Sequence, residues 1–286
     1  MNTALLHPPL SAATLGSMAT DALISEVTLP GKPGLVGPDG CRGHADMDME
    51  LMIRSAHVLQ PTFEKMAAVA ATRPIGVELR ELLGSIGRAG EADMMAATNG
   101  TNTHRGAIWN LGLHVMAVSH LQNYAKRQKP GVVEITETAG RLARLPDSWL
   151  DSENRPGKAA RKKYGVGGAV SEAGQGFPHV RAIVDEIAAT PGHPHSAQLR
   201  GLLRSMSTLD DTCLLHRGGR AGLQFVQQGA AELLRRPGDE HTLPWPALSL
   251  FDRELTHREL SAGGSADLLA CAMFLASFEG DNNAAH

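Results

Sequence analysis

Cysteine, aromatic residues and net charge are all scarce in this chain of 286 residues. Its three cysteines, Cys41, Cys213 and Cys271, are too few and too far apart for a disulfide framework or a cysteine-based zinc site, which favours a reducing cytoplasm. Aromatic residues are 4% of the chain, which argues against an aromatic-rich β-barrel or β-sandwich. The formal charge of −3 argues against a dedicated nucleic-acid binder, so we expect no nucleic acid as partner.

Long apolar runs are also missing. The longest, from Leu268 to Phe278, is too short to span a bilayer. The N-terminus lacks the charged start and continuous apolar stretch of a signal peptide. Hydrophobic residues still make up 42% of the chain, enough to bury a core at this length. We therefore expect a soluble cytoplasmic protein with no membrane partner.

Several enzyme signatures are absent as well. No G-x-x-x-x-G-K-[ST] occurs, which excludes a P-loop protein. No H-E-x-x-H, no adjacent His-Asp pair and no G-x-S-x-G nucleophile elbow is present. The run from Gly165 begins like a dinucleotide-binding loop, but Val170 replaces its third glycine and no strand is predicted before it.

What the chain does have is helical periodicity almost throughout. Apolar residues recur at spacings of three and four, as in Leu79, Leu82, Leu83 and Ile86, and strand-like alternation is almost absent. This pattern predicts an all-α fold, a single globular multi-helix domain of roughly ten helices with Gly-rich functional loops. We expect the catalytic domain over residues 20–280, with disorder over residues 1–19 and in the tail, residues 281–286. The polar stretch from Pro146 to Gly168 is the best candidate for an excursion from this body.

The 31 glycines are many for a helical protein, because a glycine inside a helix costs about 1 kcal/mol relative to alanine. Most of them fall in short polar motifs between the predicted helices. Such loops at helix starts are where backbone N–H groups can meet phosphates, so we expect the chemistry there. In chain order, the motifs are residues 31–34, 99–106, 165–168, 217–219 and 263–267.

Acidic residues stand beside several of these loops. Asp46 and Asp48 precede one predicted helix, Asp210 and Asp211 precede another, and Asp267 falls in the first turn of a third. Carboxylate oxygens in these positions suit a hard cation such as Mg²⁺. Each set also has a plainer interpretation, as helix caps or as solvated side chains. The residues alone leave both interpretations open.

Basic and polar residues in the same loops are candidates for anion binding. Asn102 and Thr103 are expected to cap a helix whose first turn holds His104 and Arg105. An ordinary capping loop would explain them equally well. Lys32 could meet phosphate, although a lone surface lysine is commoner.

Taken together and in this order, the motifs resemble those of the triphosphoribosyl-dephospho-coenzyme A synthases. The resemblance spans about residues 20 to 278. The segments Leu209–Cys213 and Arg105–Trp109 resemble the malonate decarboxylase branch of that family more than its citrate lyase branch. The motifs that carry the resemblance are Lys32-Pro33-Gly34-Leu35-Val36, His44 to Asp48, Asn102-Thr103-His104-Arg105-Gly106, Gly176-Phe177-Pro178, Asp211-Thr212, Arg217-Gly218-Gly219 and Gly263 to Leu269.

The resemblance implies transfer of the 5-triphosphoribosyl group of ATP to the 2′-hydroxyl of 3′-dephospho-CoA, with release of adenine. The triphosphate is carried along rather than cleaved, which fits the missing P-loop. The product would be the prosthetic-group precursor for the acyl carrier subunit of malonate decarboxylase. A phosphoribosyl-dephospho-CoA transferase and an acyl carrier protein are then the downstream partners, Mg²⁺ is the cofactor, and a homodimer is a candidate assembly.

The implied reaction gives the motif residues candidate roles. It needs a general base, a carboxylate near C1′ and a proton donor for adenine. At one place the chain departs from the family pattern Gly-Ala-Arg-Gly-Glu-Ala, because Val170 stands where the family has arginine. The candidates are Glu172, Asp211 and His44 for catalysis; Asp46, Asp48, Asp210, Asp211 and Asp267 for Mg²⁺; and Lys32, Asn102, Thr103, His104, Arg105, Arg217, Gly263, Gly264 and Ser265 for substrate and phosphate.

Two other functions fit the same residues. The first is a Mg²⁺-dependent hydrolase of nucleotides or ADP-ribosyl groups, since acidic loops on a helical body suit that chemistry. The second is a non-catalytic helical partner of a decarboxylase complex, which the missing arginine at Val170 keeps open.

Overall fold

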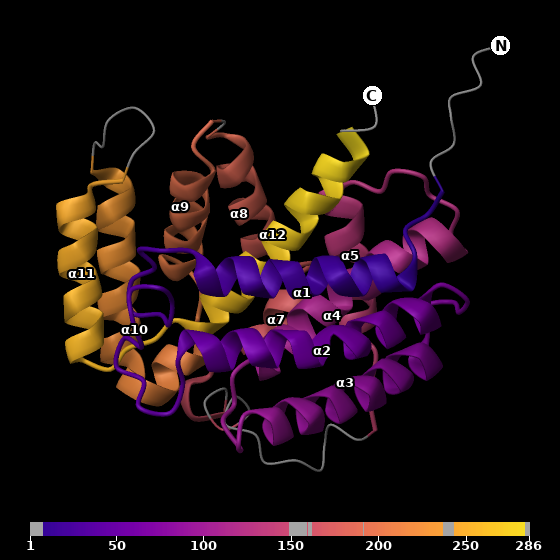
Figure 1. Ribbon diagram of the computed structural model, residues 1–286, viewed down its shortest axis with the longest axis horizontal. Coiled ribbons are helices and arrows are strands. Elements are labelled where there is room, and N and C mark those ends of the chain that lie inside the picture. The colour runs from indigo at the N-terminus through magenta and orange to yellow at the C-terminus, as the bar shows by residue number, and fades with distance from the viewer. Residues whose placement is uncertain (1–7, 149–158, 160–161, 191, 237–242, 284–286) are drawn as a thin grey trace.

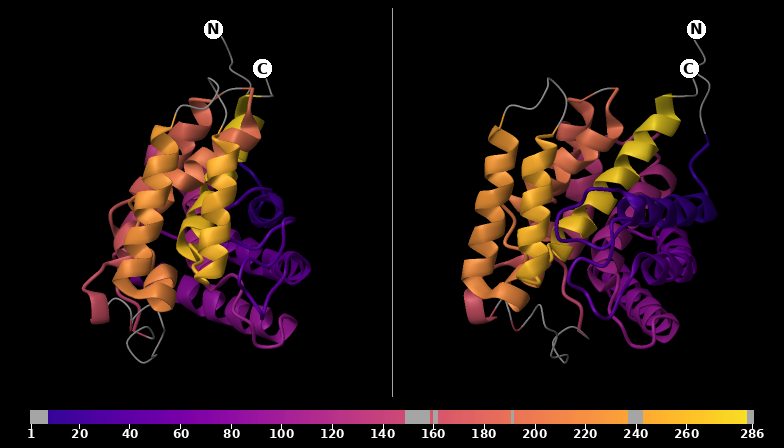
Figure 2. Two further views of the ribbon diagram at one scale, coloured as in Figure 1. Left: turned by 90° about the vertical axis from the view of Figure 1, so that its left-hand side faces the viewer. Right: turned by 60° about the vertical axis from the view of Figure 1, so that its left-hand side comes forward.

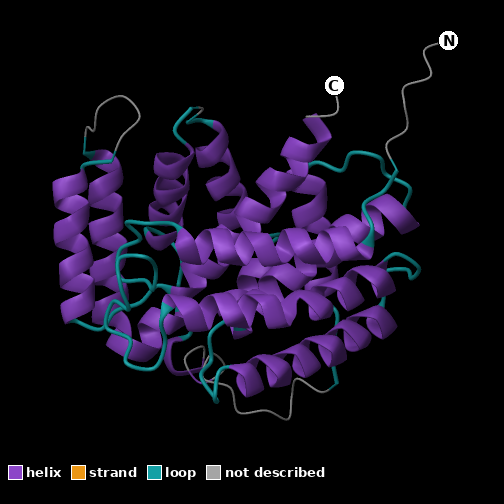
Figure 3. Cartoon of the chain, in the orientation of Figure 1, coloured by secondary structure: helices purple, strands orange, loops and turns teal. Residues whose placement is uncertain are grey.

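The computed structural model describes residues 8–148, 159, 162–190, 192–236 and 243–283, and the regular elements in these ranges are helices joined by loops. Within these ranges there is no strand, and Gly37 and Gly40 form one isolated antiparallel bridge (Figure 3). The expected all-α class is therefore confirmed. The helical elements are α1 (Ala12–Thr28), α2 (Met49–Ala70), α3 (Val77–Ala97), α4 (Arg105–Ser119), the π-helix η1 (His120–Tyr124), α5 (Val132–Ala143), α7 (Gly168–Gly174), α8 (Pro178–Ala188), α9 (Pro194–Met206), α10 (Thr212–Arg235), α11 (Trp245–His257) and α12 (Gly263–Asn283).

The helices form two groups with different directions. Helices α1, α2 and α3 lie side by side along one edge, whereas α8 to α11 stand roughly across them at the other (Figures 1 and 2). Helix α12 joins the groups, because it packs against α1 and α4 on one side and against α8, α9 and α10 on the other. The first turns of α4, α10 and α12 therefore come to the junction between the groups.

The apolar stripes predicted from the sequence are the faces that pack at these contacts. Leu79 and Leu83 of α3, Ile183 of α8 and Val226 of α10 are all buried. Helix α4 is buried nearly all round, as expected for a helix enclosed by others. Of the helices described, none is both long and apolar enough to cross a membrane.

The chain ends differ from the expectation. Helix α1 begins at Ala12, with Ser11 as its N-cap, so the disorder expected over residues 1–19 is wrong from Ala12 onward. The reason is that Leu15 and Ala19 are fully buried and anchor this first segment. At the other end α12 continues to Asn283, so the tail expected from residue 281 is helical over its first three residues.

The polar stretch from Pro146 to Gly168 is anchored near its start by ion pairs of Asp147. The Asp147 carboxylate has no exposed surface and lies 2.9 Å from Arg80 Nη1 and 3.2 Å from Arg88 Nη1. Residues 149–158, where the excursion was expected, lie outside the described part of the chain.

Candidate active site

Asp211 holds the starts of α10 and α12 together. It is the N-cap of α10 and is 2% exposed. Its Oδ1 accepts a hydrogen bond from the Cys213 backbone N–H at 2.8 Å, and its Oδ2 accepts one from the Ser265 backbone N–H at 3.0 Å. A Cβ at Gly264 would lie 3.1 Å from this carboxyl group, which explains why glycine stands there. Burial raises the pKa of Asp211, and these hydrogen bonds oppose the rise.

A second carboxylate at this junction faces α4. Asp267, in the first turn of α12, lies so close to Gly106 that a Cβ at Gly106 would overlap its carboxyl oxygen. Burial raises the pKa of Asp267 well above its usual range, and the nearby charges of Asp211 and Glu26 add to the rise. In the described part of the chain no hydrogen bond reaches the Asp267 carboxylate. Within the described ranges, this carboxylate therefore lies beside two other acids and accepts from no side chain or backbone N–H.

Lys32 and His104 lie on the other side of the same junction. Lys32 is 3% exposed, and its Nζ donates to Glu26 Oε1 at 2.6 Å, so its charge is already paired. His104 is the N-cap of α4, and its Nδ1 lies 2.8 Å from Ser55 Oγ. Burial, with the nearby Lys32 charge, lowers the pKa of His104 to about 4. At neutral pH this histidine is uncharged, and its Nε2 has no hydrogen-bond partner in the part of the chain that the structure describes.

The inner face of α4 carries further polar atoms without partners. Asn110 and His114 follow Gly106 at spacings of four, so the three residues share one face of the helix. Both side chains are buried, and among the described residues Asn110 Oδ1 and His114 Nε2 have no hydrogen-bond partner. Burial lowers the pKa of His114 to about 4, although its Nδ1 donates to the Asn110 carbonyl oxygen at 2.7 Å. Buried polar atoms in native proteins are nearly always hydrogen-bonded, so this face has the character of a ligand-binding surface.

The far end of that face meets the turn between α7 and α8. The Phe177 ring lies 4.4 Å from the His114 ring, between centroids. Phe177 adopts a left-handed backbone conformation, φ 55°, which is rare for a residue with a side chain. Such strain is tolerated where surrounding structure fixes it, and it is concentrated at functional sites.

Glu172 is fixed at this turn by a histidine that the sequence analysis missed. Glu172 is 5% exposed, and its Oε1 accepts a hydrogen bond from the His179 backbone N–H at 2.9 Å. The ring Nδ1 of His179 donates to Glu172 Oε2 at 2.7 Å, and its Nε2 lies 3.1 Å from Thr208 Oγ1. The available signal was a histidine directly after Gly176-Phe177-Pro178, at the start of a proline-initiated helix.

The Cys271 thiol of α12 is influenced by the charges of both Glu172 and Asp267. Burial raises the pKa of the Cys271 thiol, and the charges of Asp267 and Glu172 raise it further. Cys271 follows Asp267 by one helical turn.

His44 and Arg217 form a separate pair, as members of two predicted motifs. Arg217 Nη2 donates to His44 Nδ1 at 2.9 Å, and His44 Nε2 lies 3.0 Å from Ser261 Oγ. Burial and the Arg217 charge lower the pKa of His44, while the nearby Asp46 opposes this shift. His44 is therefore poorly suited to carry a proton at neutral pH.

Other predicted residues lie away from the junction. Asp48 is exposed and caps α2 by accepting the Leu51 N–H at 2.8 Å, which is the plainer interpretation of this residue. Asp46 and Asp210 are exposed. Asn102 is exposed and accepts the Arg105 N–H at 3.2 Å, whereas the N-cap of α4 is His104 and not Asn102 or Thr103.

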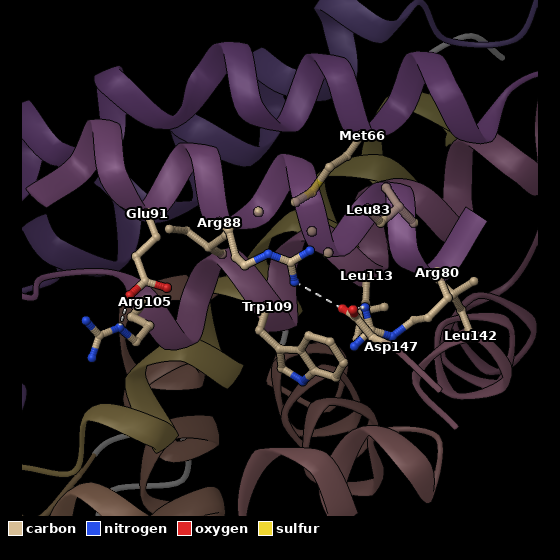
Figure 4. A pocket seen from close by; sticks show the side chains of 14 residues that line it. Met66, Arg80, Leu83, Arg88, Glu91, Arg105, Trp109, Leu113, Leu142 and Asp147 are labelled. Atoms are coloured by element: carbon tan, nitrogen blue, oxygen red, sulfur yellow. Dashed lines mark hydrogen bonds and ion pairs between the residues drawn. The ribbon is translucent and has the colours of Figure 1, made fainter. Parts of the chain in front are cut away.

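Arg105 points toward α3 rather than toward Asp267. Its Nε lies 2.5 Å from Glu91 Oε1, at one end of a pocket between α3 and α4 (Figure 4). At the other end Arg88 reaches toward Asp147, and the Arg80 guanidinium lies 4.8 Å from the centre of the Trp109 ring. The cations of this pocket are thus largely paired with carboxylates.

The five predicted Mg²⁺ ligands do not form a ready-made metal site. Among the described residues, no group of three or more His, Cys, Asp or Glu side chains is arranged to hold a metal ion. Val170, where the family pattern has arginine, is 42% exposed on α7.

Fold and site together define an all-α protein with buried carboxylates and glycines at the starts of α10 and α12 and unpaired polar atoms along α4. A family model described as "CitG: ATP:dephospho-CoA triphosphoribosyl transferase" matches residues 12–285. The chain therefore belongs to this family, and it is a transferase.

Curated relatives agree with this assignment. The chain is 42% identical over 278 residues to the 2-(5''-triphosphoribosyl)-3'-dephosphocoenzyme-A synthase of Klebsiella pneumoniae, covering 96% of this chain and 98% of the relative. It is also 42% identical over 279 residues to a protein of Pseudomonas syringae pv. syringae whose name marks it as a probable synthase of the same kind, covering 96% and 94%. No solved structure matches the chain.

Proposed function

We propose that this chain transfers the 5-triphosphoribosyl group of ATP to the 2′-hydroxyl of 3′-dephospho-CoA and releases adenine. The observation that carries the proposal is the polar interior between α4, α7, α8 and α12. There burial and two nearby acids disfavour the charge of Asp267, and Asn110 and His114 each hold a buried atom that no described residue hydrogen-bonds. A bond from the acceptor oxygen to C1′ forms as the bond from C1′ to adenine breaks, and the triphosphate stays attached to the ribose.

Asp267 is our candidate for stabilising positive charge at C1′. Its charge is disfavoured in the free protein, because burial and the charges of Asp211 and Glu26 raise its pKa. A ribosyl centre that becomes cationic as adenine leaves would relieve this unfavourable charge. Interactions that strengthen only in the transition state raise the rate, so this arrangement suits catalysis.

Asn110 and His114 are our candidates for binding the adenine base. Both are uncharged at neutral pH, since burial lowers the pKa of His114 to about 4. Neutral hydrogen-bonding groups between apolar walls suit an uncharged heteroaromatic ring, and the Phe177 ring borders them. Backbone N–H groups at the starts of α4 and α12, with Arg217, are then candidates for the triphosphate.

We propose that Mg²⁺ binds together with the triphosphate of ATP. Mg²⁺ is commonly held by one or two carboxylates together with substrate phosphates, which fits a chain whose described residues offer no three-ligand set. We also propose a cytoplasmic role in the malonate decarboxylase branch, where a further transferase would pass the product to an acyl carrier protein. The support for this branch is the sequence of segments 105–109 and 209–213.

The test is chromatographic detection of adenine after incubation of the protein with Mg-ATP, with and without dephospho-CoA. Adenine that appears only when both substrates are present supports the transfer. Adenine released from ATP alone would favour the nucleotide hydrolase instead. No adenine under either condition would favour a non-catalytic partner.

A further inference from the structure

We propose that His179 is the general base that takes the proton from the acceptor hydroxyl, and that Glu172 is its positioning residue. The inference rests on the proposed transfer reaction and names a residue for its proton step. It starts from the two hydrogen bonds between these residues, at 2.9 Å and 2.7 Å.

Glu172 is poorly placed to act as the base itself. Each of its carboxylate oxygens accepts a hydrogen bond from His179, one from the backbone and one from the ring. The side chain is also 5% exposed, so the carboxylate lies behind the imidazole. A substrate hydroxyl that approached Glu172 would have to displace His179 first.

The same contact prepares the ring for proton transfer. A carboxylate that accepts from Nδ1–H fixes the tautomer whose Nε2 carries a lone pair, and it stabilises the imidazolium that forms later. The His179 side chain is 21% exposed while that of Glu172 is 5% exposed, so solvent reaches the imidazole more readily than the carboxylate. The arrangement is therefore a buried carboxylate, an oriented imidazole and a ring nitrogen that faces an exposed hydroxyl.

An alcohol already lies against that nitrogen. Thr208 Oγ1 is 3.1 Å from His179 Nε2, and Thr208 itself is exposed. A hydroxyl at hydrogen-bond distance from a base is the geometry that general-base catalysis requires. In the proposed complex the 2′-hydroxyl of dephospho-CoA takes the place that the Thr208 hydroxyl holds.

This position is consistent with Asp267 at C1′. Helix α12, which carries Asp267, packs against α8, the helix that carries His179. Thr208 lies three residues before Asp211, whose carboxylate holds the start of α12. A base beside Thr208 and a carboxylate at the α12 start thus serve neighbouring parts of one site.

The proton step balances without a further reagent. The O–H bond of the 2′-hydroxyl breaks and its proton moves to His179 Nε2. The oxygen electron pair forms the bond to C1′, and the electron pair of the C1′–N bond leaves with adenine. The imidazolium returns its proton to the departing adenine through solvent, so no proton is consumed overall.

If His179 only held the α7–α8 turn in place, its variants would lose stability rather than catalytic rate. The base assignment predicts the opposite. In His179→Asn the shorter amide keeps an N–H donor near the position of Nδ1 but has no base at Nε2. We expect this variant to keep its melting temperature and KM, while kcat for adenine release falls about 100-fold or more. In His179→Ala, added imidazole should restore part of the lost rate in a concentration-dependent way.

The matched control is His57→Asn, because His57 is exposed on α2, away from the junction. Its kcat should equal that of the wild type. A His179→Asn variant with kcat within about threefold of an active wild type would overturn the base assignment, whereas general-base removal costs far more. A wild type that releases no adenine with both substrates would overturn the proposed function, and the base with it.

Discussion

Asp211 and Ser265, 54 residues apart, join the first turns of α10 and α12. The Asp211 carboxylate accepts from the Ser265 backbone N–H at 3.0 Å and from its hydroxyl at 3.4 Å. Its other oxygen caps α10. Gly263 and Gly264, which precede Ser265, let α12 pack closely against the start of α10. The Asp211 carboxylate binds the first turn of α12 through Ser265.

Replacing Asp211 with asparagine should weaken this junction. One carboxylate oxygen becomes an NH₂ group that faces a backbone N–H, so one buried donor loses its acceptor. We expect the free energy of unfolding to fall by about 1–3 kcal/mol, with most adenine release lost. Urea unfolding and the adenine assay measure both effects. Asp93→Asn is the control, since Asp93 is exposed on α3, and equal behaviour of the two variants would contradict this role.

Gly106→Ala should displace Asp267, because the new Cβ would overlap its carboxyl oxygen. We expect kcat for adenine release to fall at least about tenfold, as for other misplaced catalytic groups. Gly131→Ala is the control, since no atom lies within 4 Å of the added Cβ there. If displacement of Asp267 is the cause, adding Gly106→Ala to an Asp267→Asn variant should lower kcat little further. Fully additive losses would show that Gly106 acts through something else.

Asp267→Asn should stabilise the protein while it slows the reaction. The native pKa of Asp267 is raised well above 3.8, the value for a free side chain. The stability that this group contributes is therefore present at low pH and is lost as pH rises through the native pKa. The asparagine variant lacks this loss, so its melting temperature should exceed that of the wild type at pH 8. A lower melting temperature of the variant at pH 8 would contradict the claim that the native state disfavours the charge of Asp267.

His104 and His114 should make the fold sensitive to acid. Burial lowers their native pKa to about 4 from 6.5, so the unfolded chain binds protons first as pH falls below 6.5. Between pH 6.5 and about 4, each histidine therefore lowers the free energy of unfolding by up to about 1.4 kcal/mol for every pH unit. His114→Leu should reduce the slope of unfolding free energy against pH by that amount. His57→Asn should leave the slope unchanged, and an unchanged slope in His114→Leu would refute the prediction.

The helices could be predicted from the sequence, because each depends on local spacing. The stripe of Leu79 and Leu83 is buried as expected, and the glycine motif at residues 263–267 does open a helix. Helix α1 was missed in part, since its small apolar residues are buried only by the rest of the fold.

Which loops meet could not be predicted. Arg217 reaches His44 across 173 positions of sequence, and no local pattern specifies that contact. Arg105 illustrates the opposite error, because its motif indicates an anion site while its side chain pairs with Glu91. His179 does not belong to any sequence pattern that indicates a catalytic histidine. Only its hydrogen bonds to Glu172 in the structure identify it.

The most direct test of the account is the mass of the product. Purified protein is incubated with Mg-ATP and dephospho-CoA. The nucleotide products are then separated by chromatography, and their masses are measured by mass spectrometry. The account predicts free adenine and one new species with the mass of both substrates less adenine, from the wild type and not from Asp267→Asn at equal time. Free ribose triphosphate beside unchanged dephospho-CoA would contradict it.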